Sequence, residues 1–265
     1  MEDVELPLTG HLAELRRRLL RAVLAIAVAF AFCYPESALI FQILEHPLRS
    51  SAETNNLKFQ IIGTGIAEAF FTRLGVSLVA SVFVAIPVIL YQLWRFIAPG
   101  LKTHEASYAK WFVLFGTLFF ASGASFCYLF VFPVGFPFFL QEYADLGIDP
   151  VLRISEYLSF TSRMMLAFGA TFELPVVIFF LARAGLVTWR QLLQFSRYAV
   201  VVIFIVAAVL TPTPDAANQF MMAIPLCFLY AASVGVAYFF GKPRPVEETA
   251  EEEKPEDSTT LPSRR

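Results

Sequence analysis

The stretch LGVSLVASVFVAIPVILYQLW, Leu74–Trp94, decides the fold class because it carries no charged side chain over a length that can cross a membrane. Spanning ~30 Å of hydrocarbon takes ~20 helical residues. An isolated strand cannot pair its backbone in lipid, so a run of this kind must be helical. Pro87 fits, because membrane helices tolerate proline kinks. We therefore predict a transmembrane helix here.

Five further apolar runs extend this pattern along the chain. They are Leu19–Tyr34, Trp111–Val134, Leu158–Ala182, Tyr198–Leu210 and Phe220–Phe240. The chain is 57% hydrophobic and only 16% charged, whereas soluble domains carry roughly 25% charged residues. We predict an all-α integral membrane protein whose six transmembrane helices form a single domain, residues 1–242. Residues 243–265 are rich in Glu and lack aromatic residues, so we expect a disordered acidic tail.

The fifth run is shorter than an ordinary span. At ~1.5 Å per residue, Tyr198–Leu210 covers roughly 20 Å. Either the membrane thins here or the helix stops short of the far side. A helix buried by its neighbours is the alternative interpretation.

Lys and Arg are distributed unevenly between the two ends of these runs. Fifteen of the 20 lie on one side, in the groups Arg16–Arg18 with Arg21; Arg95, Lys102 and Lys110; Arg183, Arg190 and Arg197; and Lys242, Arg244, Lys254, Arg264 and Arg265. The other side holds Arg49, Lys58, Arg73, Arg153 and Arg163. Because positive residues stay in the cytoplasm, we predict that both termini are cytoplasmic. The long outer loops, around residues 36–70 and 135–157, are half apolar and predict ordered caps with short interfacial helices.

Cysteine and histidine usage argues against metal or redox chemistry. Cys33, Cys127 and Cys227 each lie within an apolar run and form no CxxC pair, so we interpret them as small apolar core residues. No zinc-site or catalytic-triad spacing is present, so we expect no metal, no cofactor and no enzyme. The acidic start lacks the features of a cleavable signal, which predicts that the first span is retained.

Three polar features remain as functional candidates. Glu14 and Arg18 lie four apart before the first span and can pair on a helix, although a simple basic anchor explains them too. Glu105 follows the Pro99-Gly100 turn, where a helix dipole alone favours a carboxylate. Glu173 lies within the fourth span, where a carboxyl costs ~2.5–3.5 kcal/mol and should face protein or water. A protonated, hydrogen-bonded Glu173 is the structural alternative.

Four motifs in this chain together resemble the TatC family. The first is His11-Leu12-Ala13-Glu14-Leu15-Arg16-Arg17-Arg18-Leu19, and the second is Leu90–Pro99 with the turn that continues to Glu105. The third is Phe172-Glu173-Leu174-Pro175, and the fourth is the turn Leu210–Asp215 followed by Gln219. They occur in the family's order, and the resemblance covers roughly residues 8–242. The turn reads Thr-Pro-Thr-Pro-Asp, one residue longer than the family's commonest form.

The resemblance implies a concave, glove-shaped bundle that receives twin-arginine signal peptides for Sec-independent export of folded proteins. Its implied partners are TatA- and TatB-type single-span proteins, membrane lipid and further copies of the chain, in a bacterial inner membrane, with no nucleic acid. The residues that match the family's signal-binding site and its surroundings are Glu14, Glu105, Arg16, Arg18, Phe96 and Lys102. The intramembrane carboxylate matches Glu173, the partner-docking positions match Thr211 and Gln219, and the structural positions match Pro47 and Asp215.

Arginine chemistry agrees with that role, because the planar guanidinium suits a carboxylate in bidentate contact. The main alternative is a secondary transporter that uses Glu173 as a proton or cation site. Such transporters show repeated halves, which this chain lacks. An intramembrane enzyme would need a base within the spans, and no His lies in any of them.

Overall fold

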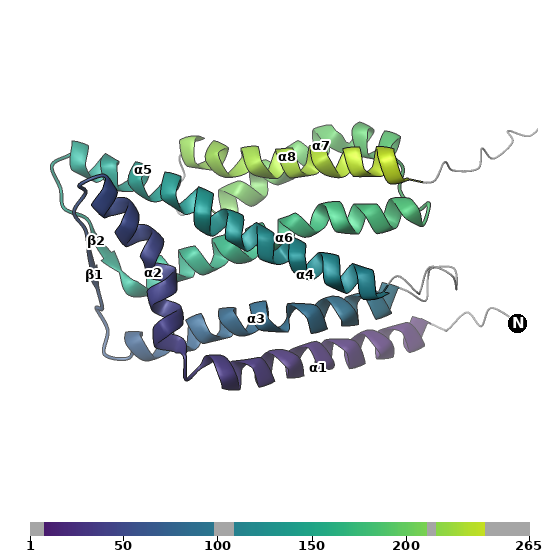
Figure 1. Ribbon diagram of the computed structural model, residues 1–265, viewed down its shortest axis with the longest axis horizontal. Helices are drawn as coiled ribbons and strands as arrows, with labels where there is room; N and C mark the ends of the chain where they lie inside the picture. Colours follow the sequence, from purple (N-terminus) through teal and green to yellow (C-terminus); the bar gives the residue numbers. More distant parts are fainter. Residues whose placement is uncertain (1–7, 98–108, 211–215, 242–265) are drawn as a thin grey trace, which may run out of the picture.

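The computed structural model describes residues 8–97, 109–210 and 216–241, which form a helical bundle with two short strands at one end (Figure 1). The long helices run back and forth along one direction. They are α1 (Leu8–Cys33), α3 (Glu68–Ile97), α4 (Ala109–Phe126), α6 (Ile154–Arg183), α7 (Trp189–Leu210) and α8 (Ala216–Phe240). We name the end where α1 begins and α8 finishes the terminal end, and the opposite end the cap end.

The number of membrane spans agrees with the sequence. In the described ranges, five helices are long and apolar enough to cross a membrane. The sixth candidate is α1 together with α2 (Ser37–Thr54), a pair bent by 89°. The protein is therefore an all-helical membrane protein with up to six spans, as predicted. The predicted acidic tail, 243–265, lies outside the described residues.

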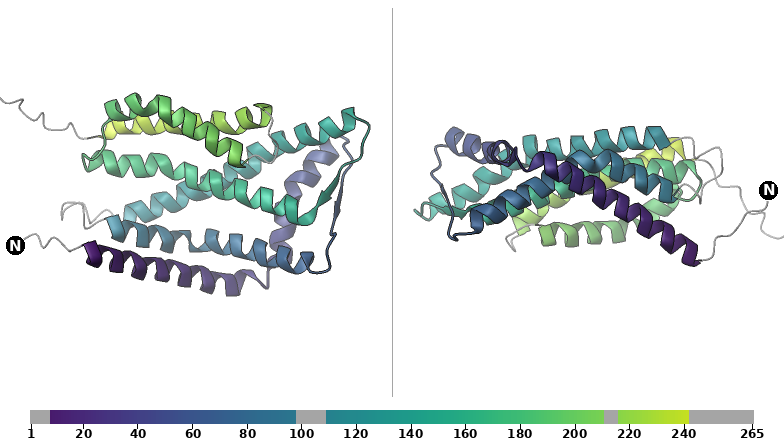
Figure 2. Two further views of the ribbon diagram at one scale, coloured as in Figure 1. Left: turned by 180° about the vertical axis from the view of Figure 1, so that it is seen from behind. Right: turned by 90° about the horizontal axis from the view of Figure 1, so that it is seen from below.

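The helices form an open row. α1 lies at one edge beside α3, and the α7–α8 hairpin lies at the other edge, with α6 between them (Figures 1 and 2). The first and last helices do not close on each other. An open row of this kind leaves broad apolar faces for lipid or other membrane helices.

The third span is longer than the sequence suggested. α4 runs through a π-helical turn, η3 (Cys127–Val131), into α5 (Phe132–Asp145), giving 37 continuous helical residues where Trp111–Val134 was expected. The wide turn lies directly before Pro133, whose nitrogen cannot donate a helical hydrogen bond. The second outer loop thus begins as a helix.

The cap end combines the expected helix with two strands that the sequence did not reveal. α2 lies across the bundle, as an interfacial helix should (Figure 1). β1 (Gln60–Ile62) and β2 (Val151–Arg153) pair in parallel, with Gln60 opposite Val151. This pairing ties the two outer loops together across the top of α3 and α6.

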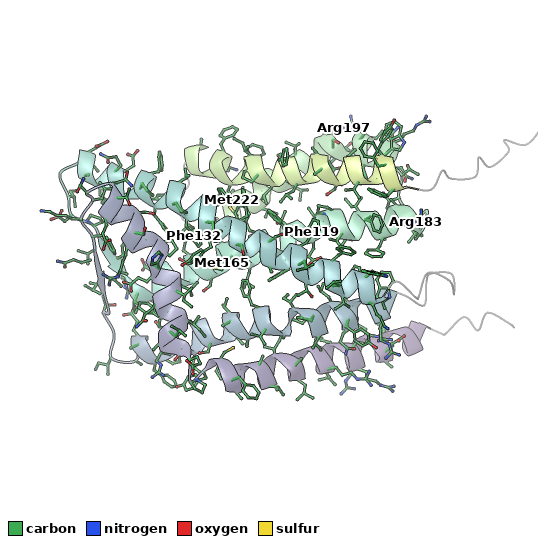
Figure 3. The ribbon with its side chains drawn as sticks, viewed as in Figure 1. Phe119, Phe132, Met165, Arg183, Arg197 and Met222 are labelled. Carbon is green, nitrogen blue, oxygen red and sulfur yellow. The ribbon has the colours of Figure 1, made fainter. Side chains whose placement is uncertain are left out.

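The fifth helix is also longer than its apolar run. α7 begins at Trp189, so Arg190 and Arg197 are helical rather than part of a loop. Both arginines lie beside tryptophan or tyrosine rings, Arg190 over Trp189 and Arg197 over Tyr198. These contacts keep the charged first turns of α7 at the membrane surface (Figure 3). The helix therefore begins earlier than the apolar run, whose uncharged part still extends from Tyr198 to Leu210.

The main core lies in the cap half and is built from side chains of α2, α5, α6 and α8. Phe132, Phe168 and Met222 are at most 1% exposed, and Figure 3 places Phe132 and Met222 toward the middle of the bundle. Of the three free cysteines, Cys127 is completely buried in this cluster. The predicted role of Cys127 as an apolar core residue is confirmed.

α4 and α6 approach each other so closely at Gly123 and Gly169 that a larger side chain would not fit at either position. A Cβ atom on Gly123 would come within 2.6 Å of the Phe168 carbonyl oxygen and 2.7 Å of the Phe172 ring. A Cβ atom on Gly169 would come within 2.8 Å of the Phe120 ring. Small residues of this kind allow membrane helices to pack backbone against backbone.

Replacing Gly123 by Ala should therefore destabilise the protein. The added methyl group collides with backbone that cannot move away, and overpacking of this kind costs ~1–3 kcal/mol. Thermal unfolding of the purified protein in detergent would measure the change. Gly235→Ala in α8 is the matched control, because its new Cβ would have no atom within 4 Å. Equal melting temperatures for the two variants would contradict the close α4–α6 contact.

Candidate functional site

Glu14 lies in the second turn of α1 at the terminal end, where it pairs with Arg18 four residues later. The predicted ion pair is therefore present. The Arg18 side chain is only 11% exposed, whereas that of Glu14 is 26% exposed. Arg18 thus binds the carboxylate from the more buried side, and part of the Glu14 side chain remains exposed to solvent. The neighbouring Arg16 is exposed on another face of the helix.

An aromatic cluster joins α3, α4 and α6 toward the terminal end of the bundle. Trp94 of α3 is 3% exposed, and its ring lies 4.8 Å from Phe112 of α4 and 5.0 Å from Phe180 of α6. Phe96 lies half-buried in the last turn of α3. The cluster fixes the two helix ends that residues 98–108 connect.

Glu105 and Lys102, the other predicted signal-binding residues of this region, lie outside the described residues. The helices that flank them are described. α3 ends and α4 begins at the terminal end, and α1 packs along α3 (Figure 1). The connection that carries Glu105 therefore starts and finishes at the same end of the bundle as Glu14.

Glu173 lies in the interior of α6 and faces protein rather than lipid, as predicted. Both carboxylate oxygens are closed off from solvent and have no hydrogen-bond partner in the described part of the chain. They lie against Gly116 of α4, where a Cβ atom would come within 3.1 Å of Oε2 and 2.8 Å of Leu90. Of the two surroundings that the sequence allowed, protein or water, the structure gives protein, because α4 packs directly over the carboxyl.

Gln219, in the first turns of α8, already forms a bond within the chain. Its Nε2 donates to the carbonyl oxygen of Phe204 in α7 over 2.9 Å. This bond holds the α7–α8 hairpin together near its turn. Thr211 and Asp215, the predicted docking and structural residues of that turn, lie outside the described residues.

Pro47 lies in the middle of α2 and changes the hydrogen bonding of the α2 backbone. Without an N–H, Pro47 leaves the carbonyl of Ile43, four residues earlier, without its helical donor. Tyr128, in the π-helical turn, donates its hydroxyl to that oxygen over 2.9 Å. Tyr157 of α6 donates to the next carbonyl, that of Leu44, over 2.6 Å. Pro47 thus creates the acceptor through which α2 binds the long helix beneath it.

No group of three His, Cys, Asp or Glu side chains that could hold a metal ion is found within the described ranges. The polar residues described above form instead an ion pair at the terminal end (Glu14 and Arg18), a buried carboxyl within the bundle (Glu173) and a hydrogen bond across the α7–α8 hairpin (Gln219). These features suit binding of charged or polar groups.

Comparison with known families decides the assignment. The family model of Sec-independent protein translocase protein (TatC) matches residues 10–225, most of the chain. The chain belongs to the TatC family.

Individual TatC proteins agree over nearly the full length. TatC of Desulforapulum autotrophicum is 43% identical over 257 residues, covering 97% of this chain and 92% of that protein. A crystal structure of a twin-arginine translocase receptor, TatC, superposes with a TM-score of 0.78 at 34% identity, covering 86% of this chain and 98% of that one. A second crystal structure of the receptor, in DDM, gives 0.78 at 35% identity, covering 88% and 100%.

Family membership removes the two alternatives that the sequence left open. A TatC-family chain is a translocase component and not an enzyme. The same finding replaces the secondary-transporter hypothesis for Glu173. The resemblance on four short motifs was therefore a correct guide to the family.

Sequence reasoning missed several residues that organise the cap end of this TatC-family protein. Glu68 accepts hydrogen bonds from the backbone of Thr64 and Gly65 and from the Ser155 hydroxyl, which joins the first turns of α3 and α6. Tyr128 and Tyr157 were equally hidden. Their only signal was a polar tip within an apolar run, which does not identify a partner 85 or 113 residues away.

Tyr128 and Pro47 should be energetically coupled. Tyr128→Phe removes the donor to the Ile43 carbonyl and should cost ~1 kcal/mol of unfolding free energy. Pro47→Ala supplies a backbone N–H to the same carbonyl, so Tyr128→Phe should cost much less in that background. A double-mutant cycle of thermal unfolding would measure the coupling. Additive costs would mean that the hydroxyl does not serve the acceptor that Pro47 leaves open.

Proposed function

We propose that this TatC-family chain binds twin-arginine signal peptides at the terminal end through the carboxylates of Glu14 and Glu105. The observation that carries the proposal is the Glu14 carboxylate, which Arg18 holds at the surface beside the end of α3. Each arginine of the signal presents a planar fork that suits a carboxylate. Two carboxylates on one face match two adjacent arginines.

The basic surroundings tune this site. Arg16, Arg18 and Lys102 offset the charge of the two carboxylates and disfavour segments that carry many positive charges. Because Arg18 already bonds Glu14, a signal arginine must share this carboxylate with Arg18. Beside Phe96, the buried ring of Trp94 packs on Phe112 and Phe180 and so joins α3, α4 and α6 next to this region.

We place the terminal end in the cytoplasm of a bacterial inner membrane, with both termini on that side. The support is the charge bias of the sequence, since fifteen of the 20 Lys and Arg residues flank the apolar runs on the side that the chain ends share. Of the labelled arginines in Figure 3, Arg183 and Arg197 both lie there. A signal peptide made in the cytoplasm would meet Glu14 directly.

We further propose that TatA- and TatB-type single-span proteins dock beside the α7–α8 hairpin, near Thr211 and Gln219. Gln219 donates to Phe204, so its side-chain oxygen remains the group offered to a polar residue of the partner. The face of α7 between Tyr198 and Val209 is largely exposed, which suits an apolar partner helix.

Glu173 would act later, when separation of α4 from α6 uncovers its carboxyl. Further copies of the chain would complete the assembly.

Neutralising the carboxylates should abolish arginine recognition without disturbing the fold. Each contact is a charge-assisted hydrogen bond worth ~1.5–3 kcal/mol, so Glu14→Gln and Glu105→Gln should each weaken peptide binding by roughly 10- to 100-fold. The double variant should no longer distinguish twin-arginine from twin-lysine peptides. The measurement is affinity for a labelled signal peptide in detergent.

Glu53→Gln is the matched control, because Glu53 is an exposed carboxylate at the cap end. It should leave both affinity and arginine preference unchanged. If the Glu14 and Glu105 variants behave like this control, the two carboxylates are helix-end charges and the signal binds elsewhere.

Gln219→Leu should weaken partner docking and loosen the hairpin together. The lost bonds are worth ~1 kcal/mol each in membranes, so site-specific crosslinking of a TatA- or TatB-type helix to α7 should fall several-fold. Gln219→Glu keeps an acceptor while losing the donor to Phe204, and it separates the two roles. Unchanged crosslinking in Gln219→Leu would move the partner to another face.

A further inference from the structure

A cavity of about 510 Å³ opens between α3 and α6 in the cap half of the bundle. Most of its wall is apolar, but one side carries Ser159, Ser162 and Arg163 of α6. None of these residues belongs to the signal site or to the partner-docking face. The cavity therefore needs its own explanation.

Arg163 lies at the level of the lipid headgroups. It precedes Arg183, which marks the terminal end in Figure 3, by 20 residues of unbroken helix. At ~1.5 Å per residue this is about 30 Å, the thickness of the hydrocarbon layer. Arg73 and Arg95 lie a similar distance apart on α3. Arg163 therefore lies at the boundary between headgroups and hydrocarbon on the cap side.

Arg163 has no counter-ion within the described part of the protein. It is exposed and forms no ion pair or hydrogen bond there. Arg73, at the same depth, instead donates to Ser37 over 2.9 Å and lies over the Tyr34 ring. A guanidinium carries five N–H donors, and a cation beside hydrocarbon is costly unless an anion accompanies it.

Two hydroxyl groups beside Arg163 are available to the same ligand. Ser159 and Ser162 lie one turn and one residue before it in the cavity wall, and neither forms a hydrogen bond in the described ranges. Glu68 also lines the cavity, but its carboxylate is occupied by Thr64, Gly65 and Ser155. Ser155 precedes Arg163 by two helical turns, about 12 Å, so the acidic group lies away from the cation, toward the cap end.

The floor of the cavity suits an acyl chain. Gly75 leaves open space, since a Cβ atom there would meet nothing within 4 Å. Val79 and Leu166 continue the apolar wall toward the middle of the membrane. Gly75 also borders a second apolar hollow, of about 490 Å³, between α1 and α3. The site thus changes from cationic at headgroup depth to apolar beneath it.

We propose that the cavity binds one anionic phospholipid of the cap-side leaflet. Arg163 and the Ser159 and Ser162 hydroxyls hold its phosphate, and an acyl chain lies over Gly75 against Val79 and Leu166. An apolar protein helix fits less well, because it would cover Arg163 without supplying an anion. The proposal is independent of the signal-binding site, and the lipid would also seal the gap between α3 and α6.

Titration of the purified full-length chain with phosphatidylglycerol, followed by native mass spectrometry, tests the site. The wild type should bind one phosphatidylglycerol at least about tenfold more tightly than phosphatidylcholine, as a charge-assisted contact allows. Arg163→Gln should lose most of this preference. Gly75→Leu should weaken phosphatidylglycerol binding by filling the chain site without altering charge. Lys58→Gln, which removes an exposed charge at the same end outside this cavity, should change neither.

Several results would overturn the proposal. Equal affinity of the wild type for both lipids would remove the anion site. An equal loss in Lys58→Gln would indicate only a general charge effect. Displacement of the lipid by millimolar inorganic phosphate would assign the site to a soluble anion. A crosslink from position 75 to a partner helix, with no bound lipid, would make the occupant a protein.

Discussion

The close approach of α4 and α6 is the constraint on which the rest of this TatC-family structure depends. At Gly123 and Gly169 the two helices meet with no room for a side chain, and the rings of Phe120 and Phe172 close around the contact. Lipid tails are as apolar as leucine, so membrane helices gain little from hydrophobicity alone. Close packing of this kind supplies the attraction instead. α6 is thereby fixed at the centre, and α3 and α8 pack against its remaining sides.

Polar groups within the bundle follow from that packing. The α4–α6 contact closes over Glu173, which keeps a carboxyl out of lipid without giving it a hydrogen-bond partner among the described residues. Where the backbone itself is interrupted, at Pro47, a tyrosine from another helix supplies the missing donor. The two polar groups to which we assign ligands, Glu14 at the terminal end and Arg163 on the cap side, lie at the two membrane surfaces. Both proposed sites thus lie at levels where water or headgroups are available.

The sequence predicted the features that depend on local composition and spacing. The apolar runs identified the long helices, and the four-residue spacing of Glu14 and Arg18 identified their ion pair. The sequence-based prediction failed where a charged residue is held in a helix by contacts that the sequence does not show. Arg190 and Arg197 resembled a loop, but aromatic rings and the nearby membrane surface allow them to begin α7. The β1–β2 pairing and the tyrosine bonds join residues far apart in the chain, so no local pattern could reveal them.

The π-helical turn at Cys127–Val131 is the place where this long helix accommodates one extra residue. Each residue of an α-helix turns the chain by about 100°, so deleting one residue elsewhere between α4 and α5 would rotate the part that follows. Phe136 and Leu140, now 4% and 3% exposed, would then turn out of the core toward lipid. A deletion within the π-helical turn would instead restore a regular α-helix and leave α5 nearly in phase. The turn therefore marks where a change of length by one residue costs the core least.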